Sequence, residues 1–255
     1  MGLSVAVIAR DEEGQIGGCL ASVAGLADET LVLLDSRSAD ATAAVAARHG
    51  ARVVVAPWRN FSAQRNLALE LCAHEWVLFV DADERVPGEL AAEIRAQLAG
   101  AHGAVGYWIR RHNLFFGRAV RGGGWYPDPQ LRLLRRDAAR YDEARAVHEV
   151  AELAGDASAL RGHLLHHNIE GLGELWAKQS AYALAEARTL YAAGRRFRRR
   201  NLLGAPAREL WRRFVTLGGW RDGALGLFLC AAMAWFEVVK FLFLRGLEAA
   251  ARRPG

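Results

Sequence analysis

WVLFVDADE, residues 76–84, places two carboxylates, Asp81 and Asp83, directly after a run of five apolar residues. The apolar run predicts a buried strand over 76–80, and the carboxyl ends of strands in open α/β sheets face the ligand crevice. Because side chains alternate along an extended chain, we expect Asp81 and Asp83 on the same side. Carboxylate oxygens suit Mg²⁺ or Mn²⁺, which complete their shell with phosphate oxygens and water. The stretch is therefore a candidate divalent metal site, although a solvated acidic turn before a helix near Pro87 explains this spacing equally simply.

Outward from this stretch, the first hundred residues alternate short apolar runs with amphipathic stretches, a pattern typical of βα units that build a mostly parallel sheet. The predicted strands are Ser4 to Ala9, Leu31 to Leu34, Arg52 to Val55 and Trp76 to Val80. The predicted helices are Gln15 to Val23, Ala39 to His49, Ser62 to Cys72, with Ser62 as N-cap, and Pro87 to Leu98. Acids also follow the first two strands, at Glu12 and Asp35, so three strand ends aim carboxylates at one edge. No Gly-x-Gly-x-x-Gly follows the first strand, which argues against a dehydrogenase.

The pattern changes after residue 103. From Gly103 to about Glu152 the chain is rich in Gly, aromatic residues and Arg, which predicts an acceptor-side subdomain. Within it, His112 to Gly117 and Gly122 to Pro129 are expected as loops around short strands. Beyond Glu170 the chain is expected to be helical: Leu172 to Ala193, then an Arg cluster, then an apolar stretch from Gly223 to Leu244.

Charge is distributed unevenly along the chain. The 255 residues are 52% hydrophobic and carry a net charge of +5, which is the composition of a folded protein. Nine arginines and one acid, Glu209, lie between Arg195 and Arg221, so this segment carries +8 and the remainder −3. A local anionic partner is expected, either lipid headgroups or phosphodiesters. Within the densest run of arginines, residues 195–200, Phe197 is the only aromatic residue, so nucleic acid is not favoured.

The stretch GALGLFLCAAMAWFEVVKFLFL, residues 223–244, is long enough to be considered as a bilayer span. Glu237 and Lys240 interrupt it, and their spacing of three lets them pair on one helical face. An interfacial helix that lies on the membrane behind the basic segment is the preferred interpretation. The alternative is a buried helix of a soluble protein. Three cysteines without paired spacing and an N-terminus unlike a signal peptide predict a cytoplasmic protein.

Several motifs in order resemble glycosyltransferase family 2, and within it the lipopolysaccharide core β-glucosyltransferase subgroup (WaaE/KdtX-like). The stretches that carry the resemblance are SVAVIARDEE, LLDSRSADAT, the triplet Gln64-Arg65-Asn66, VLFVDADERV, GGGWYPDPQLRLLRR, the triplet Val147-His148-Glu149 and FEVVKFLFL. The resemblance covers nearly the whole chain. It implies an α/β GT-A fold, a Rossmann-like nucleotide-diphospho-sugar transferase domain, over residues 1–168, with a nucleotide-binding half over 1–100 and an acceptor-side half over 101–168. A helical, membrane-associating extension would follow over 169–255.

The resemblance also implies roles for individual residues. It places Asp35 and residues around Glu12 on a uridine, Asp81 near the ribose, and Asp81 and Asp83 on Mg²⁺ or Mn²⁺. The implied donor-binding residues are Ala9, Arg10, Glu12, Asp35, Gln64, Arg65, Asn66, Asp81, Ala82, Asp83 and Arg132. Asp128 is the implied general base, with Glu149 as the competitor. Neighbouring aromatic side chains, Trp125 and Tyr126, could raise the pKa of Asp128 toward working pH.

The implied reaction is an inverting transfer of glucose from UDP-glucose, a UDP-hexose donor, onto an inner-core sugar of lipopolysaccharide. The enzyme would lie on the cytoplasmic, inner face of the plasma membrane, with a lipid-linked glycan as acceptor and an anionic membrane surface as partner. Two alternatives stay open: transfer to a polyprenyl phosphate or another envelope glycan, and a non-catalytic membrane-attached binding protein. His148, His166 and His167 lack metal-ligand spacing, so a zinc site is not expected. Arg132, with Arg135 and Arg136, could contact a diphosphate or an anionic acceptor, or form a solvated strand edge.

Overall fold

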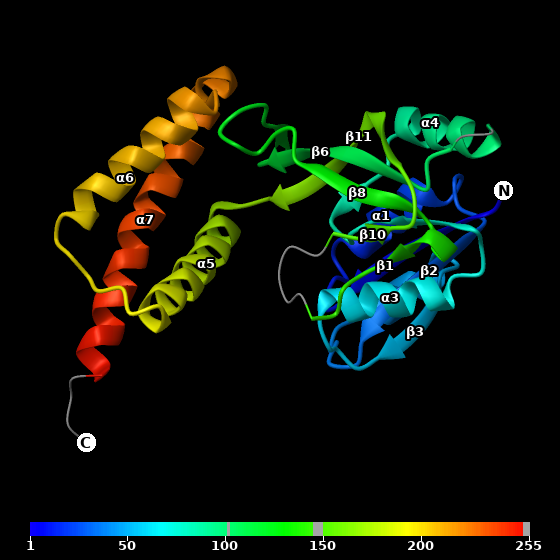
Figure 1. The fold of residues 1–255 in the computed structure, drawn as a ribbon, viewed down its shortest axis with the longest axis horizontal. Coiled ribbons are helices and arrows are strands. Elements are labelled where there is room, and N and C mark those ends of the chain that lie inside the picture. The colour runs from blue at the N-terminus through cyan, green and yellow to red at the C-terminus, as the bar shows by residue number, and fades with distance from the viewer. Residues whose placement is uncertain (101–102, 145–149, 252–255) are drawn as a thin grey trace. The chain divides into compact units, whose positions relative to one another are not determined.

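The computed structural model describes residues 1–100, 103–144 and 150–251 and divides the chain into two compact units (Figure 1). The first unit comprises Met1–Arg111 and Asp128–His166, and the second comprises His112–Pro127 and His167–Gly255. Residues 112–127, which the sequence groups with the acceptor-side half, therefore belong to the same unit as the C-terminal helices.

A mixed sheet runs in the order β3-β2-β1-β4-β8-β6-β11-β5, with β7 paired to β6. Its members are β1 (Leu3–Ala9), β2 (Glu29–Asp35), β3 (Arg52–Ala56), β4 (Trp76–Phe79), β5 (Glu84–Arg85), β6 (Gly106–Phe115), β7 (Arg118–Ala119), β8 (Pro129–Arg135) and β11 (Ala157–Ile169). Strand β1 pairs in parallel with β2 and β4, and β2 with β3, as the alternating pattern predicts. Strands β8, β6 and β5 add antiparallel pairings. A separate ribbon joins β9 (Ala139–Arg140) to β10 (Glu152–Leu153).

Helices cover both faces of the parallel strands in the first unit. They are α1 (Ile16–Val23), α2 (Thr42–Arg48), α3 (Phe61–Leu71) and α4 (Gly88–Ala99), and a short 3₁₀ helix spans Arg136–Ala138. Figure 1 shows α3 lying across β1, β2 and β3. Alternation along each strand feeds two cores: Leu78 and Val80 belong to one apolar cluster, whereas Val77 and Phe79 belong to the other. Strands β1, β2 and β4 contain nearly continuous apolar runs because both of their faces are buried, whereas the edge strand β3 is only partly buried.

Three local expectations were wrong. Helix α3 is capped by Asn60, whose side chain accepts a hydrogen bond from the Ala63 N–H at 2.8 Å, and Ser62 is already helical and buried. Strand β6 continues to Phe115, so residues 112–115 are strand rather than loop. Strand β11 was not predicted at all, because most of its residues are exposed or half-buried and its polar and imidazole side chains interrupt the apolar alternation.

The second unit is built from helices α5 (Leu172–Ala192), α6 (Asn201–Trp211) and α7 (Gly223–Ala251), with a π-helical turn over Arg212–Thr216 and a 3₁₀ turn over Gly219–Asp222. Its core contains Phe115, Val120, Leu229, Met233 and Phe236. Helix α7 with its preceding turn, residues 219–251, is long and apolar enough to cross a membrane by length and composition.

The predicted pair on α7 forms: Lys240 donates to the Glu237 carboxylate, and also to Glu186 Oε2 of α5 at 3.0 Å.

Candidate functional site

Asp81 and Asp83 lie in a tight turn that follows β4. The Glu84 N–H donates to the Asp81 carbonyl at 2.9 Å, and β5 begins at Glu84. The side chains of Asp81 and Asp83 therefore project from a turn. Contrary to our expectation, the alternation of side chains along an extended strand does not set their orientation. Their placement depends on what each side chain contacts.

Asp81 is held by arginines. Arg132 Nη1 donates to Asp81 Oδ1 at 3.1 Å and Arg132 Nη2 to Asp81 Oδ2, while Arg111 Nη1 lies 3.7 Å from Oδ2. Enclosure by the surrounding protein raises the pKa of the Asp81 carboxyl, but the charges of Arg132, Arg65 and Arg111 outweigh it and hold that pKa well below its usual range. Asp81 is therefore an ionised group at the carboxyl end of β4.

Glu84, which the sequence reading left without a role, is the fully buried counterion of this arrangement. Its carboxylate is 0% exposed and accepts hydrogen bonds from the Asp81 N–H at 2.9 Å, Arg111 Nη1 at 3.0 Å and Arg132 Nη2 at 3.2 Å. Arg132 itself is only 2% exposed, and its guanidinium group pairs with the carboxylates of Asp81 and Glu84. A buried charge needs such partners. Glu84 thus stabilises the turn that carries Asp81 and Asp83. The sequence signal for this role is its position directly after Asp-x-Asp.

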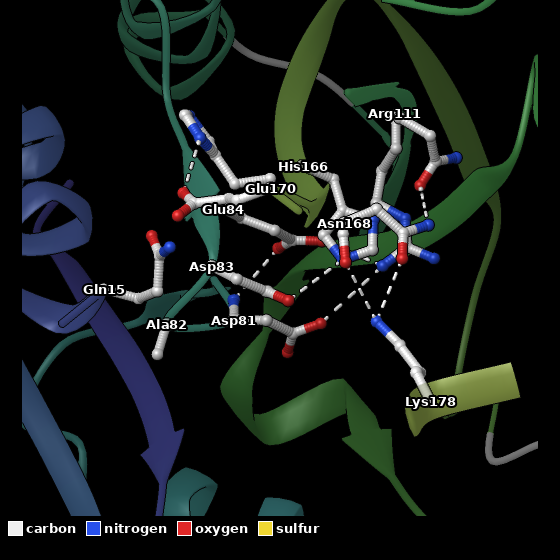
Figure 2. Close-up of polar contacts among 12 residues, drawn as sticks. Gln15, Asp81, Ala82, Asp83, Glu84, Arg111, His166, Asn168, Glu170 and Lys178 are labelled. Atoms are coloured by element: carbon white, nitrogen blue, oxygen red, sulfur yellow. Dashed lines mark hydrogen bonds and ion pairs between the residues drawn. The ribbon is translucent and has the colours of Figure 1, made fainter. Parts of the chain in front are cut away.

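Asp83 faces a histidine from a distant strand. Strand β11 pairs antiparallel with β5, and His166 stands opposite Glu84 in that register. His166 Nε2 consequently lies 3.1 Å from Asp83 Oδ2, as Figure 2 shows. The two side chains are 12% and 31% exposed, so the pair opens toward solvent. We had given the histidines no role, because the sequence alone does not reveal this register.

The Asp83 and His166 pair has the chemistry of a partial metal site. The carboxylate oxygen suits Mn²⁺ or Mg²⁺, and the imidazole nitrogen beside it favours the transition metal Mn²⁺ over Mg²⁺; either ion takes its remaining ligands from phosphate oxygens and water. Among the described residues, no group of three His, Cys, Asp or Glu side chains could hold an ion alone. The donor set therefore fits an ion that a phosphorylated ligand helps to bind.

A pocket of about 450 Å³ lies at the carboxyl ends of β1 and β2 in the same unit. Four predicted donor-binding residues line it: Ala9, Arg10, Glu12 and Asp35. Four further lining residues were not predicted as site residues: Ile8, Arg37, Trp58 and Phe61. Trp58 and Phe61 pack edge to face with ring centroids 4.7 Å apart, which gives the pocket an aromatic wall.

Asp35 is the more deeply buried of the two acids that line this pocket, Glu12 and Asp35. It is 4% exposed, and Arg37 donates to it from its backbone N–H at 3.0 Å and from Nη2 at 2.6 Å. These hydrogen bonds from Arg37 hold the pKa of the Asp35 carboxyl below its usual range. The pocket therefore combines a carboxylate acceptor, guanidinium donors and apolar rings.

The predicted triplet Gln64-Arg65-Asn66 lies on α3, and its members have different surroundings. Gln64 Nε2 donates to the Pro57 carbonyl at 2.7 Å, next to Trp58. Arg65 packs against the rings of Phe79 and Tyr141, with its guanidinium carbon 5.4 Å from each centroid.

Asn66 exchanges two hydrogen bonds with the Tyr141 backbone, both at 2.9 Å. Asn66 is therefore tied to the backbone of a neighbouring segment.

Asp128, the predicted base, precedes β8. Its backbone has a positive φ of 29°, a conformation that costs free energy in a non-glycine residue and is often found at functional sites. Its carboxylate accepts from Arg111 Nε at 2.8 Å and from Gln130 Nε2 at 2.9 Å, and its side chain is 25% exposed. Arg111 thus links Asp128 to Glu84. The competing base, Glu149, lies outside the described residues.

The chain is similar to known glycosyltransferases in sequence and in fold. The glycosyl transferase family 2 model matches residues 4–150. The lipopolysaccharide core biosynthesis glycosyltransferase LpsC of Rhizobium meliloti is 31% identical over 230 residues, which is 88% of this chain and 84% of LpsC. An uncharacterised glycosyltransferase of Rickettsia typhi, RT0209, is 26% identical over 76% of this chain and 70% of its own length.

The crystal structure of S. aureus TarS 1–349 in complex with UDP-GlcNAc has a TM-score of 0.50 at 16% identity, covering 99% of this chain and 92% of that one. At this identity the similarity concerns the fold alone. The α/β GT-A fold expected from the sequence is thereby confirmed, and the expected C-terminal apolar helix is present as α7. Together, the family match and the long alignment with LpsC show that the chain is an enzyme that belongs to glycosyl transferase family 2.

Proposed function

We propose that this enzyme transfers a hexose, glucose from UDP-glucose, with inversion onto an inner-core sugar of lipopolysaccharide. The observation that carries the proposal is the pairing of Asp83 with His166 at 3.1 Å in the unit that also holds the pocket around Asp35. The similarity to LpsC over 88% of the chain supports the acceptor class.

The pocket around Asp35 would bind the uridine. The Asp35 carboxylate is an acceptor suited to the ring N–H of uracil, and Trp58 offers a ring on which a base could stack. Ala9 at the end of β1 leaves room for the base, and Arg10 and Glu12 line the same pocket. Arg37 would have to share Asp35 with the ligand or turn toward its phosphates, because it now occupies both carboxylate oxygens.

Asp83 and His166 would hold Mg²⁺ or Mn²⁺, with Asp81 and Ala82 beside them in the turn. When bound, the ion supplies positive charge that stabilises the departing diphosphate. Asp81 would accept from the ribose hydroxyls while Arg132 keeps it ionised. We assign Arg132 this indirect role, because a guanidinium that is 2% exposed would have to leave two acids to contact the diphosphate directly.

Asp128 would act as the general base. In an inverting transfer, a carboxylate oxygen takes the proton of the acceptor hydroxyl as that oxygen attacks the sugar. Arg111 fixes the Asp128 carboxylate through Nε and Nη2, at 2.8 and 2.7 Å. Arg111, which contacts both Asp128 and Glu84, would therefore connect the general base to the turn that carries Asp81 and Asp83.

Attachment to the cytoplasmic face of the membrane would come from the second unit. Helix α7 exposes Leu227, Phe228, Trp235 and Leu242, at 50, 43, 48 and 44%. Its one internal ion pair is turned toward α5 through Lys240 and Glu186, so it does not interrupt this apolar surface. Exposed aromatic and aliphatic side chains on a long apolar helix suit an interfacial position.

Transfer of labelled glucose from UDP-glucose would test the proposal. We expect label on lipopolysaccharide truncated to its inner core, in the presence of Mn²⁺. Label that appears only on a polyprenyl phosphate would contradict the proposed acceptor. An enzyme that binds UDP but labels no glycan would support a non-catalytic binding protein instead.

A further inference from the structure

A cavity of about 350 Å³ lies in the second unit where α5 ends, α6 begins and α7 passes. Five arginines line it: Arg195, Arg196, Arg198, Arg200 and Arg208. No carboxylate is among its lining residues. Five guanidinium groups around one cavity repel each other, and each can only donate hydrogen bonds. The cavity is therefore suited to an anion.

The basic segment divides into paired and unpaired arginines. Arg212 and Arg213 form ion pairs with Glu209 at 2.7 and 2.6 Å. Within the part of the chain that the structure describes, Arg195, Arg198 and the other cavity arginines have no acidic partner within ion-pair distance, although acids are available on α5, α6 and α7. Of the seven arginines in this segment without such a partner, five line the cavity.

Two contacts hold the loop that carries these arginines. The Phe197 N–H donates to Glu248 Oε1 of α7 at 2.6 Å, and Arg245 lies over the Phe197 ring at 5.8 Å. Helix α6 begins at Asn201, which also lines the cavity, so the positive end of its dipole adds to the field there. A cavity whose donors are already placed costs less to order when a ligand binds.

We propose that this cavity binds the phosphate of an anionic lipid headgroup. Guanidinium groups match phosphate oxygens in paired hydrogen bonds. Leu190, Phe241 and Leu244 form the apolar part of the cavity wall, and Leu203 nearby on α6 is 79% exposed. Apolar surface beside a cluster of arginines fits a headgroup whose acyl chains lie in the membrane. A nucleic acid bound at the cavity would need exposed rings to stack on there, whereas Phe197, the aromatic residue among these arginines, is half-buried and packed under Arg245.

The inference deepens the proposed membrane attachment and is independent of the sugar-transfer chemistry. Its test is binding of the full-length chain to phosphatidylcholine vesicles that contain phosphatidic acid, compared with vesicles of equal charge carrying a carboxylate-headed lipid. Two triple variants are compared: Arg195→Gln/Arg198→Gln/Arg200→Gln in the cavity, and a control with three exposed arginines outside it, Arg118→Gln/Arg188→Gln/Arg199→Gln.

Both triple variants lose the same charge from the same unit, so a difference between them reports the cavity. We expect the cavity variant to lose at least about tenfold more affinity for phosphatidic acid vesicles than the control, because charge-assisted hydrogen bonds are lost. We also expect the wild type to prefer phosphatidic acid over the carboxylate-headed lipid. Equal losses in the two variants would overturn the proposal in favour of diffuse attraction to the surface.

Two further arms identify the source of the phosphate. If inorganic phosphate or pyrophosphate raises the melting temperature of the wild type while the cavity variant still binds vesicles normally, a soluble anion is the ligand and the proposal is wrong. If the wild type binds a single-stranded oligonucleotide more tightly than phosphatidic acid vesicles, and the cavity variant loses that binding, the proposal is also wrong. UDP binding, measured on the wild type and on every variant, monitors the first unit. If the wild type does not bind UDP, the proposed sugar transfer is contradicted, while the proposal for the cavity is unaffected.

Discussion

Replacing Glu84 by glutamine removes a negative charge that is 0% exposed and faced by two guanidinium groups, at 3.0 and 3.2 Å. Glu84→Gln keeps the shape of the side chain and one acceptor oxygen, but it leaves Arg111 and Arg132 with less than their full countercharge. Removing one partner of a buried ion pair costs about 3–5 kcal/mol, and the retained acceptor points to about 3 kcal/mol. In a chain of this size that corresponds to a fall in melting temperature of about 6–12 °C.

Differential scanning calorimetry on the full chain would measure this loss, with Glu75→Gln as the matched control. Glu75 pairs with Arg135 at 3.4 Å, but the two side chains are 40% and 43% exposed. An exposed pair contributes less than about 1 kcal/mol, so the control should melt within about 4 °C of the wild type. If Glu84→Gln melted as close to the wild type as the control does, Glu84 would not be the required counterion.

A double variant sharpens the test. Glu84→Gln combined with Arg111→Gln should lose less stability than the two single variants added together, because each substitution alone leaves the other charge without its partner. Strict additivity would show that the two side chains do not interact in solution.

Three further outcomes are expected. Trp58→Ala should weaken UDP binding by about 1–3 kcal/mol, measured by calorimetry, and an unchanged affinity would remove Trp58 from the base-binding wall. Asp128→Asn should lower turnover by about 10²–10⁴-fold with UDP affinity kept, whereas full turnover would point to Glu149 as the base. Because Arg37 lowers the folded-state pKa of Asp35 below the ordinary 3.8, their pairing stabilises the fold fully above that pH and loses its effect as pH falls through the folded-state value. Arg37→Ala should therefore move the Asp35 carboxyl titration, followed by ¹³C NMR, upward toward 3.8, and an unmoved midpoint would contradict the assignment.

Local pattern was sufficient for the parallel half of the sheet. Strands β1, β2 and β4 contain the apolar runs 5–9, 31–34 and 76–79 because both of their faces are buried, and the strand ends were predicted to within two residues. The same pattern placed Asp35 and Asp81 at strand ends, where the structure has them.

That local pattern does not predict which strands pair when they are far apart in the sequence. His166 contacts Asp83 only because β11 pairs with β5 in one register, across more than eighty residues of sequence. A shift of one residue would turn the imidazole to the other face of the sheet. Trp58 likewise lines the pocket from the segment between β3 and α3, and this segment has no periodic pattern that would predict where its side chains lie.

The central claim is that Asp83 and His166 hold a divalent ion together with a nucleoside diphosphate. Titration calorimetry of UDP with and without Mn²⁺, on the wild type and on Asp83→Ala and His166→Ala, tests it most directly. We predict that Mn²⁺ strengthens UDP binding to the wild type and that both variants lose this enhancement while keeping their metal-free affinity. Mn²⁺-dependent UDP binding that survives unchanged in both variants would contradict the claim.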